Sequence, residues 1–152
     1  MRSLLFVPAD SERKLAKAPG CGADAIVLDL EDAVAAESKE AARKGAVDFL
    51  AARSPKGPSI QVRINGLQSD HIDADLDAIV PARPDVIMLP KATSGNDVAL
   101  LSAMIAAREA TAGIDDGTIR ISAMATESPG ATLRLANYRG ASARLAAIAW
   151  SS

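Results

Sequence analysis

The stretch Ala25-Ile26-Val27-Leu28-Asp29-Leu30-Glu31-Asp32 joins an almost unbroken apolar run to three carboxylates. A strand with one face in water alternates apolar and polar residues, whereas the first four residues of this stretch are all apolar. Runs of this kind are typical of parallel strands that are covered on both faces. The stretch therefore predicts a buried parallel strand that ends in acidic side chains.

The same pattern recurs along the chain. Five further apolar runs cover residues 4–7, 60–64, 86–89, 119–125 and 145–150. Amphipathic, Ala-rich segments separate them, and we expect helices over residues 11–18, 38–52, 70–80, 96–112 and 131–138. This alternation predicts right-handed crossovers and a parallel sheet. The strands start about 28 residues apart, so eight units would need about 230 residues, which is close to the usual length of a (β/α)8 barrel.

Two folds can contain six such units. One is a complete, open, doubly wound sheet, and the other is a barrel that stops after its sixth strand. An open sheet of the dinucleotide-binding type has a glycine-rich turn after its first strand, but residues 8–11 read Pro8-Ala9-Asp10-Ser11. No Gly-Lys-Ser/Thr phosphate loop is present either. The sequence therefore favours an α/β fold, a TIM-type (β/α)8 barrel with about six units, forming a single incomplete domain over residues 1–152.

The composition excludes several classes of protein. With 152 residues, 49% of them hydrophobic, and a net charge of −2, the chain is long enough for one domain with a real core. Lys and Arg are scattered and aromatic residues are few, which argues against a nucleic-acid surface. No apolar run approaches the roughly 20 residues that cross a membrane. A single cysteine, Cys21, excludes an internal disulfide, and we expect a cytoplasmic protein.

Polar residues follow several of the predicted strands, where parallel α/β folds place their chemistry. The carboxylates of Asp29, Glu31 and Asp32 form either a salt-bridged rim or an acidic wall that holds a cation or its bound waters. Arg63 ends the third strand, and its fork of five N–H donors suits a substrate carboxylate. Because the second and third strands of a barrel are adjacent, Arg63 can also pair with these acids, and both roles can hold at once.

Two further strand ends carry charged residues. Lys91 follows the fourth strand, as either a Schiff-base nucleophile or an ion-pair partner of the acidic wall, and the ion pair is favoured. Glu127 follows the fifth strand and is the best single candidate ligand for Mg²⁺, which takes one or two protein carboxylates. His71, the only histidine, lies in a loop among Asp residues that fit a helix start better than a metal site.

Several motifs together resemble one family. They are Ser3-Leu4-Leu5-Phe6-Val7-Pro8-Ala9, Val27-Leu28-Asp29-Leu30-Glu31-Asp32-Ala33-Val34, Val62-Arg63-Ile64-Asn65-Gly66-Leu67, Met88-Leu89-Pro90-Lys91 and Thr126-Glu127-Ser128-Pro129-Gly130-Ala131. In this order and spacing they resemble the HpcH/HpaI aldolase and citrate lyase β-subunit family, and they cover essentially the whole chain. The resemblance implies a (β/α)8 barrel, usually oligomeric in its full-length form. It also implies Mg²⁺-dependent chemistry at a carbon–carbon bond beside a thioester or a 2-oxo acid.

The resemblance also implies roles for individual residues. Arg63 would bind the carboxylate or carbonyl oxygen of the oxo-acid half of the substrate, and Glu127 would ligate Mg²⁺. Phe6 and Lys17 would contact the CoA portion of the substrate. Ser11 stands where several relatives carry an arginine for the CoA phosphates, which argues against tight CoA binding.

One residue separates the branches of the family. Asp32 occupies the place where the 2-oxo-acid aldolases of the HpcH/HpaI type carry a histidine base. This favours the branch of carbon–carbon lyases that cleave a citryl-, malyl- or citramalyl-type thioester, carried on CoA or an acyl carrier protein, into an acyl thioester and an oxo acid. A 2-oxo-acid aldolase is the alternative within the family.

The end of the chain departs from the family pattern. Relatives continue the sixth strand as Trp-Gly-Ala-Glu-Asp-Leu, whose aspartate is the second metal ligand, whereas this sequence reads Ala149-Trp150-Ser151-Ser152. We therefore expect a metal site with one of its two carboxylates and a barrel with open edges that self-associates. A catalytically inactive barrel fragment, or a subunit that needs a partner chain, remains an alternative to an active lyase.

Overall fold

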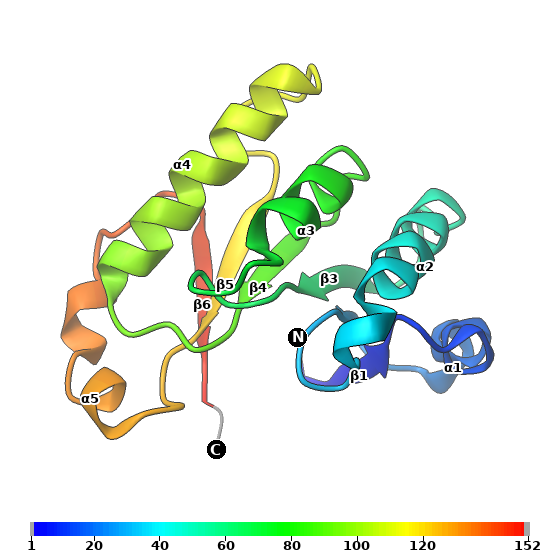
Figure 1. The fold of residues 1–152 in the computed structure, drawn as a ribbon, viewed down its shortest axis with the longest axis horizontal. Helices are drawn as coiled ribbons and strands as arrows, with labels where there is room; N and C mark the ends of the chain where they lie inside the picture. The colour runs from blue at the N-terminus through cyan, green and yellow to red at the C-terminus, as the bar shows by residue number, and fades with distance from the viewer. Residues whose placement is uncertain (1, 151–152) are drawn as a thin grey trace.

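The computed structural model describes residues 2–150, which form one six-stranded parallel sheet (Figure 1). Its strands are β1 (Leu4–Pro8), β2 (Ala25–Asp29), β3 (Ser59–Arg63), β4 (Val86–Leu89), β5 (Arg120–Met124) and β6 (Leu145–Ala149). The spatial order is the order of the sequence, β1 to β6. A doubly wound sheet reverses its strand order at a switch point, and this sheet does not. The fold is therefore of the TIM-barrel type, as predicted.

Helices follow the outside of the curved sheet (Figure 1). They are α1 (Glu12–Lys17), α2 (Lys39–Ala51), α3 (Ile72–Ile79), α4 (Gly95–Thr111) and α5 (Pro129–Thr132), with short 3₁₀ turns η1 (Ala18–Cys21), η2 (Ala36–Ser38) and η3 (Leu135–Tyr138). The helix predicted over residues 131–138 is wrong in part, since α5 ends after four residues and η3 follows it. Pro129 begins α5, and Ser128 caps it by accepting a hydrogen bond from the Ala131 N–H.

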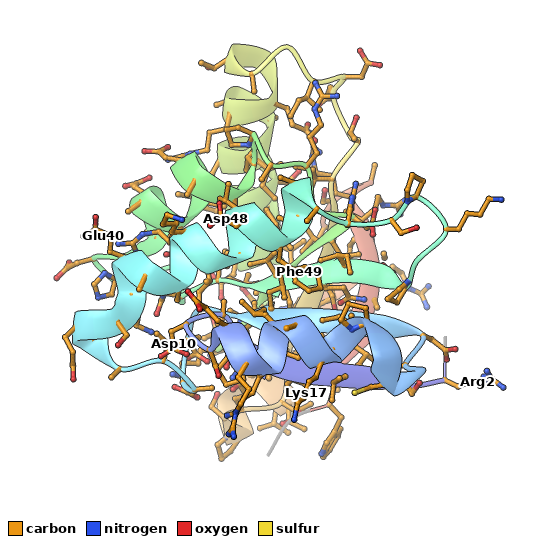
Figure 2. The ribbon with its side chains drawn as sticks, turned by 90° about the vertical axis from the view of Figure 1, so that its right-hand side faces the viewer. Arg2, Asp10, Lys17, Glu40, Asp48 and Phe49 are labelled. Carbon is orange, nitrogen blue, oxygen red and sulfur yellow. The ribbon has the colours of Figure 1, made fainter. Side chains whose placement is uncertain are left out.

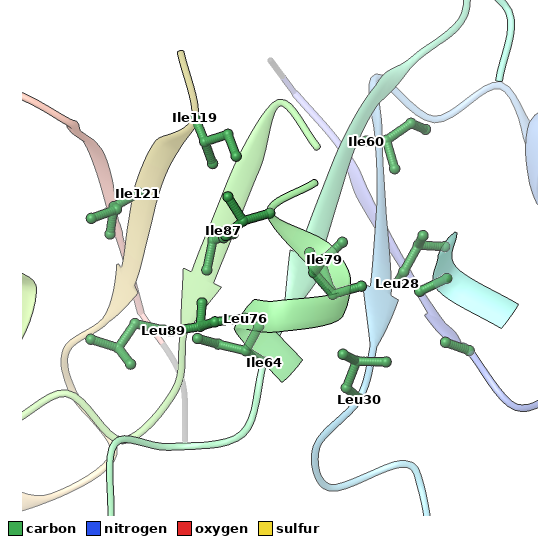
Figure 3. Packing of buried hydrophobic residues seen from close by; sticks show 14 of the residues in the cluster. Leu28, Leu30, Ile60, Ile64, Leu76, Ile79, Ile87, Leu89, Ile119 and Ile121 are labelled. Atoms are coloured by element: carbon green, nitrogen blue, oxygen red, sulfur yellow. The ribbon is translucent and has the colours of Figure 1, made fainter. Parts of the chain in front are cut away.

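The main core lies between the outer face of the sheet and the helices. Figure 3 shows Ile64, Ile87 and Leu89 of the strand region beside Leu76 and Ile79 of α3, and all five are fully buried. The strand registers explain this face, because residues paired across parallel strands point to the same side of the sheet. None of the helices in the described part of the chain is long and apolar enough to cross a membrane.

The inner face of the sheet carries polar and charged residues among apolar ones near the carboxyl ends of the strands. The registers align Pro8 with Asp29, Asp29 with Arg63, Arg63 with Met88, and Met88 with Ser122. Asp29 and Arg63 are therefore neighbours on the inside of the barrel, which sets the geometry of the candidate site.

Candidate active site

Arg63 and Asp29 form a two-pronged ion pair at the ends of β3 and β2. The Arg63 Nε lies 2.7 Å from Asp29 Oδ1, and the Arg63 Nη2 lies 2.6 Å from Asp29 Oδ2. The same carboxylate accepts backbone hydrogen bonds from Glu31 at 3.0 Å and Ala33 at 3.2 Å. Asp29 is 1% exposed. Each oxygen of the buried carboxylate thus accepts two hydrogen bonds, and the carboxylate holds the guanidinium in one orientation.

The guanidinium of Arg63 has two further neighbours. Its Nη1 lies 3.3 Å from Glu31 Oε2, and its central carbon lies 5.1 Å from the centre of the Phe6 ring. Burial opposes the charge of Arg63, but the bonds and charges of Asp29, followed by the charges of Glu31 and Asp32, outweigh it and raise the pKa of Arg63. Phe6, Asp29, Glu31 and Arg63 therefore form one cluster at the strand ends. Within this strand-end cluster Arg63 is a permanent cation.

Lys91 joins the acids of β2 to the end of β4. Its Nζ donates to Glu31 Oε1 and, over 3.1 Å, to Asp32 Oδ1. The hydrogen bonds to Glu31 and Asp32 raise the pKa of Lys91. Burial opposes the charge of Asp32, but the hydrogen bond and charge of Lys91 outweigh it and lower the pKa of Asp32. Since a Schiff-base lysine needs a lowered pKa, the structure supports the predicted ion pair.

Glu127 reaches the same cluster from the loop after β5. Its Oε2 accepts a hydrogen bond from the backbone N–H of Lys91, whose φ of 54° is left-handed. Its Oε1 makes no hydrogen bond or ion pair within residues 2–150, and the side chain is partly exposed. A single carboxylate with a free oxygen suits a cation that keeps most of its waters, as Mg²⁺ does.

A cluster of metal ligands is absent from the described residues. No group of three or more His, Cys, Asp or Glu side chains among residues 2–150 is arranged to hold a metal ion. A cation bound by Glu127 would need water molecules, substrate oxygens or a side chain outside the described residues as its other ligands. Ser151 and Ser152, which stand in place of the family pattern, lie outside the described residues.

Lys17 and His71 lie outside the cluster. Lys17 ends α1, and its exposed side chain makes no bond in the part of the chain that the structure describes. Lys17 is therefore not joined to Arg63, Lys91 or Glu127 by any hydrogen bond or ion pair within residues 2–150. His71 stands at the start of α3 without a side-chain capping bond. Asp75, four residues after His71, is fully buried and accepts hydrogen bonds from Asn65 and Arg43.

Two buried polar residues beside the ends of β2 and β3, Lys39 and Asn65, were not found by reasoning from the sequence. Lys39 at the start of α2 bonds to the ends of β2 and β3, and Asn65 donates to Asp75 Oδ2 from both its backbone, at 2.8 Å, and its side chain, at 2.6 Å. Asn65 lies two residues beyond Arg63 in a motif already singled out, so it carried a weak signal. Lys39 carried none, because a lysine early in an amphipathic helix ordinarily faces solvent.

The strand-end charges border a cavity of about 600 Å³. Its walls include Glu31, Asp32, Lys39, Asn65 and Lys91. A larger hollow of about 870 Å³ lies between α1 and α2 on the outer surface, where Figure 2 shows Asp10, Asp48 and Phe49. None of the charged residues at the carboxyl ends of β2 to β5 lines that hollow, so we place the chemistry in the smaller cavity and on the adjoining inner face.

Comparison with known proteins agrees with these observations. A (3S)-malyl-CoA thioesterase of Cereibacter sphaeroides is 38% identical over 104 residues, which cover 68% of this chain and 36% of the thioesterase. The citrate lyase subunit beta of Leuconostoc mesenteroides subsp. cremoris is 34% identical over 151 residues, 99% of this chain and 50% of that protein. The chain thus spans about half or less of the length of the curated relatives it matches.

Solved structures share the fold. Protein CitE from Mycobacterium tuberculosis, in complex with magnesium and acetoacetate, superposes with a TM-score of 0.75 at 29% identity, over 97% of this chain and 52% of that one. Another structure of that protein also contains coenzyme A (TM-score 0.70, 29% identity, 97% and 47% covered). Finally, the family described as HpcH/HpaI aldolase/citrate lyase matches residues 2–152. The chain therefore belongs to the HpcH/HpaI aldolase/citrate lyase family.

Proposed function

We propose that this chain carries the substrate-binding part of a Mg²⁺-dependent carbon–carbon lyase. The enzyme would cleave a citryl-, malyl- or citramalyl-type thioester into an acyl thioester and an oxo acid. The observation that carries the proposal is the meeting of Arg63, Lys91 and Glu127 at the carboxyl ends of neighbouring barrel strands. Similarity to citrate lyase β subunits and to CitE, solved with magnesium and small acids, supports it.

Arg63 would bind the carboxylate of the oxo-acid half. A guanidinium has five N–H donors, and Asp29 takes one from Nε and one from Nη2. The second N–H of Nη2 and those of Nη1, weakly engaged by Glu31, remain for substrate. Because Asp29 already fixes the fork, binding a carboxylate costs little further ordering of the side chain.

Glu127 is the residue that would hold Mg²⁺ in this chain. Bound there, Mg²⁺ would act as a Lewis acid toward the substrate oxygen that changes between hydroxyl and carbonyl. In cleavage, this hydroxyl loses its proton and becomes the carbonyl of the oxo acid. The carbon–carbon bond breaks, and its electron pair passes to the acyl thioester as an enolate, which then takes up a proton. Arg63 keeps the neighbouring carboxylate fixed throughout.

Phe6 and Lys17 would contact the thioester carrier. Phe6 is 44% exposed on β1 beside Arg63, and Lys17 is exposed on α1. A thioester on CoA or an acyl carrier protein would therefore reach the site over β1 and α1. We further propose a cytoplasmic location and a homo-oligomer for the full-length protein, as in the family.

Hydrolysis of a malyl-type thioester is the second candidate function. The 38% identity to a (3S)-malyl-CoA thioesterase favours it. Lyase action yields an acyl thioester and an oxo acid, whereas hydrolysis yields the free acid and the free thiol. Product analysis separates the two without any variant.

The test is a cleavage assay with citramalyl-CoA, malyl-CoA and a citryl thioester, with and without Mg²⁺. We expect Arg63→Ala and Glu127→Ala to lose activity by about 100-fold or more. Arg53→Ala, which removes an exposed partner of Asp85, is the matched control and should keep activity. Full activity in both site variants would refute the residue roles. No turnover of any thioester would favour an inactive fragment or a subunit that needs a partner chain.

A further inference from the structure

Lys39 is an ammonium group buried beneath the strand ends. It is 8% exposed, and its Nζ lies 2.6 Å from the carbonyl oxygen of Leu30, 2.8 Å from that of Glu31 and 2.8 Å from Asn65 Oδ1. An ammonium has three N–H donors, and these three oxygens use all of them. Lys39 borders the cavity at the mouth but has no donor left for a substrate.

The three acceptors belong to two different strand ends. Leu30 and Glu31 follow β2, and Asn65 follows β3. Asn65 is itself anchored by Asp75, which Arg43 holds at 3.1 Å. Lys39 therefore ties the start of α2 to the two segments that carry Glu31 and Arg63.

The bonding of Lys39 is unusual for a buried charge. Its three hydrogen-bond partners are neutral oxygens, and within residues 2–150 it forms no ion pair with a carboxylate. Removing an ammonium from water is costly, and an apolar side chain of the same length would avoid that cost. A charge kept under these conditions points to a role in orienting the oxygens it binds.

The backbone turn at Leu30–Glu31, which Lys39 binds, also carries the Glu31 side chain. The Glu31 carbonyl bound by Lys39 also accepts a hydrogen bond from the Val34 N–H at 3.1 Å. The Glu31 side chain then bridges Arg63 and Lys91. We infer that Lys39 is a positioning residue, which acts through the turn at Leu30–Glu31 to hold Glu31 between Arg63 and Lys91. For catalysis, this inference rests on the proposed lyase function.

The experiment compares Lys39→Met with Lys44→Met, the same substitution at an exposed site on the same helix. Hydrogen exchange is measured at the Ala33 and Val34 amides, whose bonds close the turn. We expect exchange about tenfold faster in Lys39→Met and unchanged in Lys44→Met. Unchanged exchange in Lys39→Met would overturn the inference.

Kinetics provide a second readout. We expect kcat of Lys39→Met to fall about tenfold while KM stays near the wild-type value, because Asp29 rather than Lys39 holds Arg63. Equal kcat in Lys39→Met and the unaltered chain would also refute the inference. If the wild-type chain shows no turnover, this result counts against the proposed function but not against the inference, because the hydrogen-exchange measurement still decides the role of Lys39.

If Lys39→Met does not unfold cooperatively, Lys39→Arg replaces it in the hydrogen-exchange experiment. A planar guanidinium keeps the charge but cannot direct three donors from one point to the same oxygens. Faster exchange at Ala33 and Val34 is expected again, and exchange at the wild-type rate would contradict the positioning role.

Discussion

At Arg63, the structure confirms the predicted pairing with the acids of the second strand, while binding of a substrate carboxylate stays a prediction. The structure pairs Arg63 with Asp29 and Glu31, and donors for a substrate carboxylate remain. This pairing was predictable, because strand alternation puts Asp29 and Glu31 on one side and adjacent strands bring Arg63 to them. The contacts of Lys39 and Asp75 were not predictable, because they join residues on different elements whose distance depends on how the helices pack.

Asp29→Asn tests the buried ion pair. Removing one partner leaves the Arg63 charge less compensated inside the protein, and we expect the free energy of unfolding to fall by about 3 kcal/mol. Urea denaturation followed by circular dichroism measures this change. Asp48→Asn, at an exposed i,i+4 pair with Lys44, should leave the stability nearly unchanged. Equal stabilities of the two variants would contradict the importance of the Asp29–Arg63 pair.

The Lys91–Asp32 pair predicts a pH window for stability. The folded pKa of Asp32 lies below its ordinary value of 3.8, so its contribution is present above that value and is lost as the pH falls further. The folded pKa of Lys91 lies above 10.5, so its contribution is present below that value and is lost as the pH rises further.

The measurement is urea unfolding of the wild type and Lys91→Met across the pH range. The stability difference between them should be level between about pH 5 and pH 10 and shrink on both sides. Because the Lys91 side chain is 57% exposed, the difference should be modest and smaller in high salt. A difference that grows below pH 4 would show that the pair does not behave as described.

At the scale of elements, the apolar runs located the six strands of the described residues. Composition alone marks the buried strands β2 to β5, whereas the outer strands β1 and β6 are apolar but partly exposed. The helices were located less well where packing or proline decides their ends. Residues 131–138 contain α5 only in part, because Ser128 and Pro129 start this helix earlier and it gives way to η3 after Thr132. Amphipathic periodicity over eight residues cannot distinguish one helix from two short turns.

Gly45 allows α2 to approach the loop after β1. A Cβ at this position would lie 2.1 Å from the Ala9 carbonyl oxygen, a contact that requires the helix or the loop to move. We expect Gly45→Ala to lower the free energy of unfolding by about 2 kcal/mol despite the better helix propensity of alanine. Gly20→Ala, with open space around the new Cβ, should be nearly neutral in the same thermal or urea unfolding experiment. A more stable Gly45→Ala variant would show that this contact relaxes easily.

For the whole molecule, the sheet of the described residues has two outer strands, β1 and β6, each paired on one side only. Large apolar side chains lie exposed near both edges: Leu4, Phe6, Ile148 and Trp150. The family resemblance predicted a barrel. The sequence pattern does not show how exposed the apolar side chains near β1 and β6 are, because their exposure depends on what packs against these two edges of the sheet.

We expect the 152-residue polypeptide to self-associate in sedimentation velocity experiments, with species heavier than 15.7 kDa whose fraction rises with concentration. Ile148→Lys places a charge beside the β6 edge and should reduce association. Leu100→Lys, at an exposed position on the outer helix α4, is the control and should not. A single monomeric species at every concentration would disprove the association.

The neighbour-to-neighbour order of the strands has a consequence for biosynthesis. Each strand pairs with the one that precedes it in the chain, so the sheet can be extended one unit at a time as the polypeptide leaves the ribosome. Asp29 emerges before Arg63, and their pairing needs nothing that is translated after β3. Lys91 and Glu127 can then be added in turn. The paired side chains of Asp29 and Arg63 are therefore able to meet during translation, before β6 has been made.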